Sequence, residues 1–386
     1  MQPAKVLDRE RLIAFTQRLV QTPSLSLEEE AIARLVEDEM RALGYDQVRR
    51  DAMGNVLGII EGRGDGPRLL FNGHIDHAGV GQMSEPFAGR IIEGQAFGHA
   101  GPVIYGRGAV DMKGGVAAMV AAGGMIKRLG AKLKGQVLVT AVAREEMARG
   151  EGIKALLDAG LSADFAVSGE ATGNQVFLGH RGKFECRITT LGRTSHGGFP
   201  QGGVNAIFKM NQVLAALQTN YPLPSHPFLG QATVTALDIS ASPGALTPIV
   251  PDRCELVVDR RFLPEETQES LLAGFRELLG DLGREDPEFR AQVEPLKWFP
   301  SLYTPPESPI AQALATARAQ VLGEPGPWGA WYFGVDGTFI SQAGIPCVGL
   351  GPGDMYLAHT PRDVVPVSEL EQAALIYAQL ILDLCS

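Results

Sequence analysis

Two histidines and five carboxylates follow predicted strands or lie in loops, and these residue types together favour metal chemistry. Imidazole nitrogens and carboxylate oxygens are the ligands that zinc takes from proteins beside cysteine. Two metal ions bridged by one carboxylate, with a spare glutamate for proton transfer, would make a hydrolase. The residues are His74, Asp76, Asp111, Glu145, Glu146, Glu170 and His359.

Asp111 lies among glycines, between Gly108 and Gly114. Glycines let the backbone approach a metal ion closely or adopt torsions that other residues avoid. An acid in this position is therefore a candidate bridge between two metals. The alternative is a helix N-cap, because a helix rich in alanine and methionine is expected to follow from Gly114.

Glu145 and Glu146 come after an apolar strand predicted at 136–142. Adjacent side chains at a strand end point in different directions, so one acid can bind metal while the other faces a reacting water. The alternative is a solvated acidic turn.

His74 and Asp76 follow an apolar strand predicted at 68–73. In extended chain they lie on the same side, and an acid can fix the second ring nitrogen of a ligand histidine. The alternative is an exposed, polar strand end. His77 should then point away from His74 and bind no metal.

Two further residues are ambiguous by themselves. His196, in a Ser-His-Gly-Gly stretch, could be an ordinary loop histidine. Arg261 ends an apolar strand and could pair with an acid or clamp a substrate carboxylate, for which the planar guanidinium is well suited.

Alternating strands and helices must position the residues before Gly179. Ser26 and Glu29 fit a capping box for a helix with its apolar stripe from Ile32 to Met40. Strands at 55–60, 68–73, 136–142 and 164–168, with helices between some of them, predict an α/β fold. The catalytic domain should hold a mixed, largely parallel sheet flanked by helices.

After Gly179 the pattern changes to alternating strands and two helices, in the order β-α-β-β-α. This predicts an α+β lid or dimerisation domain with an antiparallel sheet, inserted into the first domain. The expected limits are 1–179 and 294–386 for the catalytic domain and 180–293 for the insert. The chain returns to an α/β pattern with a strand at 347–350 and a helix at about 368–384.

Composition argues for an ordinary globular protein. The 386 residues are 45% hydrophobic, and 44 acids against 34 bases give a net charge of −10, which disfavours nucleic acid or anionic membrane as a partner. The four cysteines are scattered and predict no disulfide framework. With no signal-peptide core and no long apolar run, we expect no membrane partner and a cytoplasmic enzyme.

Taken in order, five segments resemble the co-catalytic metallopeptidase and deacylase family, which includes acetylornithine deacetylase, succinyl-diaminopimelate desuccinylase and glutamate carboxypeptidase. The resemblance covers essentially the whole chain and comes closest to the YgeY-type hydrolase branch. The segments are 73–76, 106–115, 145–146, 169–172 and 359–361.

The resemblance implies two divalent metal ions, zinc first and cobalt or manganese as options. One metal would be held by His74, Asp111 and Glu170, and the other by Asp111, Glu146 and His359. The Asp111–Met112 peptide bond would be cis. His77 stands where many relatives have threonine.

The remaining implied roles belong to catalysis and substrate binding. Asp76 would orient His74, and Glu145 would activate a metal-bridging water and then protonate the leaving amine. His196 would stabilise the oxyanion, often from a partner subunit of a homodimer. Asn205 and Arg261 would contact the substrate.

The expected activity is cleavage of the amide bond of an N-acyl amino acid or small peptide that carries a free carboxylate. A di- or aminopeptidase of the same family is the alternative among enzymes. A non-catalytic homologue that binds amino-acid ligands is the alternative from another class, and an intact Glu145 argues against it.

Overall fold

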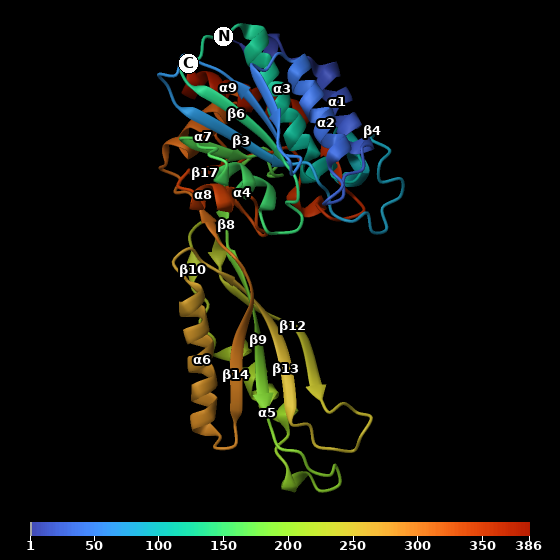
Figure 1. The fold of residues 1–386 in the computed structure, drawn as a ribbon, viewed down its shortest axis with the longest axis vertical. Helices are drawn as coiled ribbons and strands as arrows, with labels where there is room; N and C mark the ends of the chain where they lie inside the picture. The colour runs from blue at the N-terminus through green and yellow to red at the C-terminus, as the bar shows by residue number, and fades with distance from the viewer. Residues whose placement is uncertain (1) are drawn as a thin grey trace. The chain divides into compact units, whose positions relative to one another are not determined.

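The computed structural model describes residues 2–386 and divides into two compact units. The first runs up to His180 and resumes over Leu302–Ser386, and the second is Arg181–Ser301. In Figure 1 the second unit is coloured green to orange and the first unit holds both the blue and the red ends of the chain, because the second unit is inserted into the first in the sequence. The expected boundary at 293/294 falls inside a strand of the second unit, β14 (Arg290–Phe299).

A nine-stranded mixed sheet forms the centre of the first unit. Its middle is parallel, since β3 pairs in parallel with β6 and β7, and β17 pairs in parallel with β7. The strands are, in spatial order, β1 (Gln47–Arg50), β2 (Val56–Ile60), β6 (Gln136–Val142), β3 (Arg68–His74), β7 (Phe165–Ser168), β17 (Cys347–Gly349), β8 (Val176–His180) and β15 (Leu302–Tyr303), with β16 (Trp328–Trp331) also on β8.

Helices cover both faces of this sheet, so the predicted α/β class is confirmed. On one face α3 and α9 pack together and against β3 and β6, and on the other α8 packs on β7 and β17 (Figure 1). The helices are α1 (Arg9–Gln21), α2 (Glu30–Ala42), α3 (Gly114–Leu129), α4 (Glu151–Asp158), α7 (Pro309–Leu322), α8 (Gly337–Gln342) and α9 (Val367–Cys385). A small sheet of β18 (Val364–Pro366), β5 (Pro102–Tyr105) and β4 (Arg90–Glu93) completes the unit.

Helix α3 and the residues just before it form a long apolar segment. Over Ala109–Leu129 it passes the length and composition test for a membrane-spanning helix, and it is the one such helix among residues 2–386. However, 94% of that window is buried inside the protein. Its apolar character is therefore accounted for by packing in the core.

The second unit is an antiparallel sheet with two helices packed on it, as predicted. Its core side chains, such as Phe184, Val258 and Phe275, are fully buried. The strands are, in spatial order, β12 (Thr233–Ser242), β13 (Arg253–Phe262), β9 (Gly182–Leu191) and β14, with a short hairpin of β10 (Ser225–His226) and β11 (Gly230–Gln231). The helices are α5 (Ala206–Thr219) and α6 (Gln268–Glu285).

The predicted β-α-β-β-α order lacked β14. Pro295 interrupts this strand, and a proline cannot donate to a ladder. The strand is nevertheless formed because it lies at the edge beside β9, with a register shift between Pro295 and Lys297. Edge strands tolerate proline and bulges, which is why a sequence pattern for a central strand missed it.

Candidate metal centre

The carboxyl ends of three neighbouring strands meet at one edge of the central sheet and carry the predicted ligands. His74 is the last residue of β3, Glu145 and Glu146 follow β6, and Glu170 follows β7. Because these strands are parallel, their ends lie side by side. This edge is where open α/β sheets place their ligands.

Asp111 presents its two carboxylate oxygens to two different histidines. Oδ1 lies 2.9 Å from Nε2 of His74, and Oδ2 lies 3.1 Å from Nε2 of His359. The Asp111–Met112 peptide bond is cis, as the family resemblance implied. The N-cap position of α3 is occupied by Lys113, so the alternative reading of Asp111 as a helix cap is wrong.

The two remaining acids divide between these histidines. Glu170 Oε1 lies 3.4 Å from His74 Nε2, and Glu146 Oε2 lies 2.9 Å from His359 Nε2. Asp111 therefore stands between a pair on one side and a pair on the other. Within 4.8 Å of one another lie single ligand atoms of His74, Glu145 and Glu170, and likewise of His74, Asp111 and Glu146.

The charges of this cluster fit a divalent cation. Burial raises the pKa of Glu170 to about 7, and the buried Oε2 atom of Glu170 has no hydrogen-bond partner among residues 2–386. Hydrogen bonding of the His359 imidazole to the carboxylates of Asp111 and Glu146 raises the pKa of His359 to about 10. The buried acids thus favour a positive charge nearby. Carboxylate oxygens together with imidazole nitrogens are a donor set that binds zinc, cobalt or manganese.

Glu145 is placed differently from the two acids and two histidines around Asp111. Its Oε2 atom comes no nearer to His74 Nε2 than 4.0 Å, and its carboxylate makes no hydrogen bond within residues 2–386. Burial raises its pKa well above the usual range for a glutamate. A carboxylate that is close to the cluster but unbound is available for proton transfer.

Asp76 contacts the backbone of the Glu-Glu pair as well as the histidine. Its Oδ1 accepts a hydrogen bond from the Glu145 amide and its Oδ2 from the Glu146 amide, both at 3.1 Å. Nδ1 of His74 lies 3.0 Å from the Asp76 carbonyl oxygen and 3.3 Å from Oδ1. The acceptor for the histidine is thus mainly a main-chain carbonyl.

The predicted capping box of Ser26 and Glu29 is wrong. Helix α2 begins at Glu30 without a side-chain cap. The Ser26 hydroxyl donates to Asp76 Oδ2 at 2.7 Å, and Glu29 Oε1 accepts from the amide of Arg144 at 3.1 Å. Both side chains are engaged at the edge of the site, which competes with capping.

His77 has both ring nitrogens occupied by the backbone. Nε2 accepts from the Ser24 amide at 3.0 Å, and Nδ1 lies 2.8 Å from the Ala78 carbonyl oxygen. Burial lowers the pKa of this imidazole to about 4. No ring nitrogen is left for a metal ion, in agreement with the expected orientation.

The second unit holds the other three predicted residues. His196 is exposed, and its Nδ1 accepts from the Gly198 amide at 3.1 Å, which leaves the hydrogen on Nε2. Asn205 caps α5 through its side-chain oxygen. Arg261 pairs with Asp259 on the same strand, Nε to Oδ1 at 2.9 Å, so its guanidinium already has an acidic partner.

Sequence reasoning missed two buried acids of the first unit. Asp336 is 3% exposed, its Oδ2 has no hydrogen-bond partner among residues 2–386, and it raises the pKa of Glu145 through its charge. Asp363 accepts from the amides of Gly108 and Val110, at 2.7 and 2.8 Å, and so supports the loop that carries Asp111. Asp336 lies between Gly334 and Gly337, a glycine-flanked position like that of Asp111.

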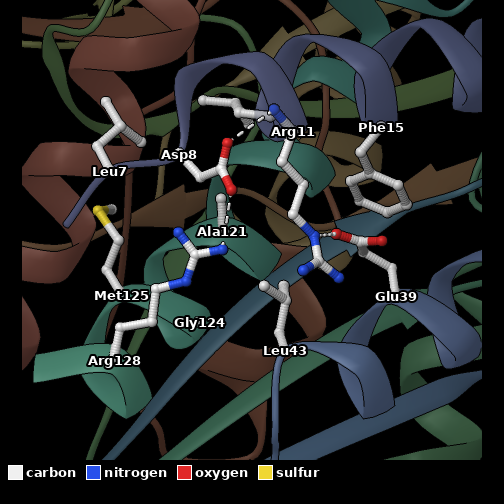
Figure 2. Close-up of a pocket in the computed structure, with 11 residues that line it drawn as sticks. Leu7, Asp8, Arg11, Phe15, Glu39, Leu43, Ala121, Gly124, Met125 and Arg128 are labelled. Carbon is white, nitrogen blue, oxygen red and sulfur yellow. Dashed lines mark hydrogen bonds and ion pairs between the residues drawn. The ribbon is translucent and has the colours of Figure 1, made fainter. Parts of the chain in front are cut away.

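A separate pocket lies between α1, α2 and α3, and none of the predicted site residues line it. Figure 2 shows apolar side chains such as Phe15 and Met125 around it. Its charged groups pair with each other, Arg11 with Glu39 at 2.7 Å and Arg128 with Asp8 at 3.0 Å. Because those charges are already compensated, the pocket does not compete with the cluster around Asp111 as the candidate site.

The family model for peptidase family M20/M25/M40 matches residues 70–383. This chain belongs to that family. The match includes every residue of the cluster around Asp111, from His74 to His359.

Individual proteins are similar to this chain over nearly its whole length. The uncharacterized protein YgeY of Escherichia coli (strain K12) is 34% identical over 95% of this chain and 92% of its own length. The succinyl-diaminopimelate desuccinylase of Hydrogenovibrio crunogenus is 27% identical over 96% and 98%. The solved structure of Bacillus subtilis YxeP, a dinuclear metal-binding M20 peptidase, aligns with a TM-score of 0.75 at 18% identity over 97% and 98%. The M20 chain described here is therefore a hydrolase that acts on amides.

Proposed function

We propose that this M20 hydrolase is a two-metal amidohydrolase, and that it cleaves an N-acyl amino acid or small peptide bearing a free carboxylate. The observation that carries the proposal is the division of Asp111, with one oxygen toward His74 and the other toward His359. Its similarity to a succinyl-diaminopimelate desuccinylase and to the structure of a dinuclear metal-binding peptidase supports the proposal.

The residues that would hold the metals follow from these distances. His74, Asp111 and Glu170 would hold one ion, and Asp111, Glu146 and His359 the other. Bound zinc, or cobalt or manganese, would polarise the scissile carbonyl and lower the pKa of water. The set of ligand atoms is rich in oxygen and can bind any of these three metals.

The chain's own groups would move the proton and stabilise charge. Glu145, which has no hydrogen-bond partner within the described residues, would take a proton from the attacking water and deliver it to the leaving amine. His196 would donate from Nε2 to the oxyanion. Asn205 and Arg261 would contact the substrate, Arg261 by releasing Asp259 for the substrate carboxylate.

Replacing Glu145 tests the chemistry separately from the metal site. We expect Glu145→Ala to lose about 10²–10⁴-fold in kcat, the usual contribution of a general base or acid, while two metals per chain remain bound. Metal content by elemental analysis and turnover of N-acetyl amino acids and dipeptides are the measurements. Near-normal turnover would remove Glu145 from the mechanism.

A di- or aminopeptidase is the second candidate, because a dipeptide also presents an amide and a carboxylate. A panel of N-acyl amino acids against dipeptides, with zinc, cobalt or manganese added, separates the two. Hydrolysis confined to dipeptides would favour the peptidase.

We also propose that the second unit mediates a homodimer and that the enzyme is cytoplasmic. Strand β12 is the edge of its sheet and exposes Leu237 and Ile239, each more than half accessible. An exposed apolar edge strand is a ready surface for pairing with a second copy. A monomeric mass in sedimentation analysis would rule the dimer out.

A further inference from the structure

We propose that Glu29 is a positioning residue for Glu145: it holds the backbone turn from which the Glu145 side chain extends. This inference rests on the proposed role of Glu145 as proton carrier. Glu29 lies far from the other site residues in the sequence, and its Oε1 atom accepts hydrogen bonds from backbone amides, so it would act only through the chain that follows β6.

Three consecutive amides after β6 are received by two carboxylates. The Arg144 amide donates to Glu29 Oε1, and the Glu145 and Glu146 amides donate to Oδ1 and Oδ2 of Asp76, all at 3.1 Å. Such a row of main-chain donors is an anion-binding arrangement, here filled by the protein's own acids. The direction of the Glu-Glu pair is thus set by two clamps, and Glu29 is the first.

Glu29 binds the amide of Arg144, a residue whose backbone conformation is unfavourable. Arg144 has φ 62°, in the left-handed region, where a side chain with Cβ is disfavoured. This residue turns the chain out of β6, so that Glu145 follows at an angle to the strand. Its amide is bound to Glu29, and the carbonyl of Glu145 accepts from the Ala148 amide at 2.7 Å.

Glu145 depends on this turn more than Glu146 does. The carboxylate of Glu146 is anchored at its far end by the Ala78 amide at 2.8 Å and by His359 at 2.9 Å. The carboxylate of Glu145 has no such hydrogen bond within residues 2–386. Loss of the first clamp should therefore misdirect Glu145 while Glu146 keeps its place.

Glu29 is itself well fixed. It is 5% exposed, and the same Oε1 atom also accepts from the Leu27 amide at 3.0 Å. Its position directly before α2 ties it to a helix whose inner residues, such as Ile32 and Val36, are fully buried. Both donors need only an acceptor oxygen, which a glutamine amide also supplies.

The test compares Glu29→Ala and Glu29→Gln with wild type, using the N-acyl amino acid or dipeptide that wild type hydrolyses fastest. Glu28→Ala, at an exposed neighbouring position, is the matched control. We expect Glu29→Ala to lower kcat by about 10–100-fold, a loss of order one charge-assisted hydrogen bond, with KM within about twofold and two metals retained. Glu29→Gln should stay within about threefold of wild type.

A readout independent of turnover is hydrogen exchange of the segment 143–147, which should quicken in Glu29→Ala and not in Glu29→Gln or Glu28→Ala. If Glu29→Ala does not fold, Glu29→Asp replaces it, since the shorter side chain withdraws the acceptor; its kcat should then fall below that of Glu29→Gln. Wild-type kcat in folded Glu29→Ala, or equal losses in the alanine and glutamine variants, would overturn the inference. If Glu145→Ala is active, the proposed function fails; if it is inactive and Glu29→Ala is normal, only this inference fails.

Discussion

Asp111 turns its Oδ2 atom toward Nε2 of His359 at 3.1 Å, although the two residues lie in loops on opposite sides of the inserted unit in the sequence. Asp363 secures this relationship. It accepts from the Gly108 and Val110 amides and from Arg107 at 3.0 Å, and it follows His359 closely in the chain. The loops of Asp111 and His359 are therefore joined by a buried ion pair and two amide contacts.

Removing the Asp111 carboxylate should cost both metals together. Asp111→Ala deletes the side chain whose two oxygens face both histidines, whereas Glu170→Ala and Glu146→Ala would each delete a proposed ligand on one side only. We expect fewer than about 0.5 metal ions per chain in Asp111→Ala and about one in each comparison variant. Elemental analysis after gel filtration measures this. Retention of one metal by Asp111→Ala would show that Asp111 is not a bridge.

Metal uptake should release protons at neutral pH. The contacts with Asp111 and Glu146 raise the pKa of His359 to about 10, so this imidazole is protonated in the metal-free protein at pH 7 and must lose its proton to bind metal. Apparent affinity should therefore rise by about tenfold per pH unit below that pKa for each proton displaced. Calorimetric titration with zinc in buffers of different ionisation enthalpy counts the protons. A binding enthalpy that is independent of the buffer would contradict the prediction.

His196→Ala should lower kcat by about 10²–10³-fold with little change in KM, the usual effect of losing one oxyanion donor. The reason is that the Gly198 amide occupies Nδ1, so Nε2 carries the hydrogen that can be donated. Steady-state kinetics measure the split. His226→Ala, a histidine elsewhere in the same unit, is the control. Equal losses in both variants would point to damage of the unit as a whole.

Arg261→Met should lower kcat/KM markedly only for substrates that have a carboxylate. We expect kcat/KM to fall by about 10–100-fold for an N-acyl amino acid, the worth of a charge-assisted pair, and by less than about threefold for the corresponding N-acyl amino amide. Arg253→Met is a close control, since Arg253 pairs with Glu255 on the same strand at 2.9 Å, in the way Arg261 pairs with Asp259. If kcat/KM falls equally for the amide substrate, Arg261 stabilises the strand and does not bind the substrate carboxylate.

The sequence predicts those elements of the fold that have a clear hydrophobic periodicity or a long apolar run. The buried strand β6 and the helices α3 and α9 were predicted nearly to their ends. Strand β14 was missed because Pro295 breaks the pattern, and its edge position, which tolerates proline, is a property of the assembled sheet.

The cluster around Asp111 was predicted from residue types and the family resemblance, and the structure brings those side chains together. What supports them was not visible in the sequence. Ser26 and Glu29 have the spacing of a capping box, and only the tertiary fold shows that their partners are Asp76 and Arg144. Local patterns cannot reveal such contacts because the partners are distant in the chain.

The apolar helix α3 has a consequence for how the protein is made. Among the other helices α3 packs most extensively against α9, which follows the inserted unit in the chain. A nascent chain on the ribosome therefore carries an α3 whose α9-facing side stays uncovered through the synthesis of the whole insert, a state prone to aggregation that chaperones would need to shield. A chain truncated before Val367 should accordingly be recovered in the insoluble fraction, and a soluble, folded truncation product would show that α3 finds another cover.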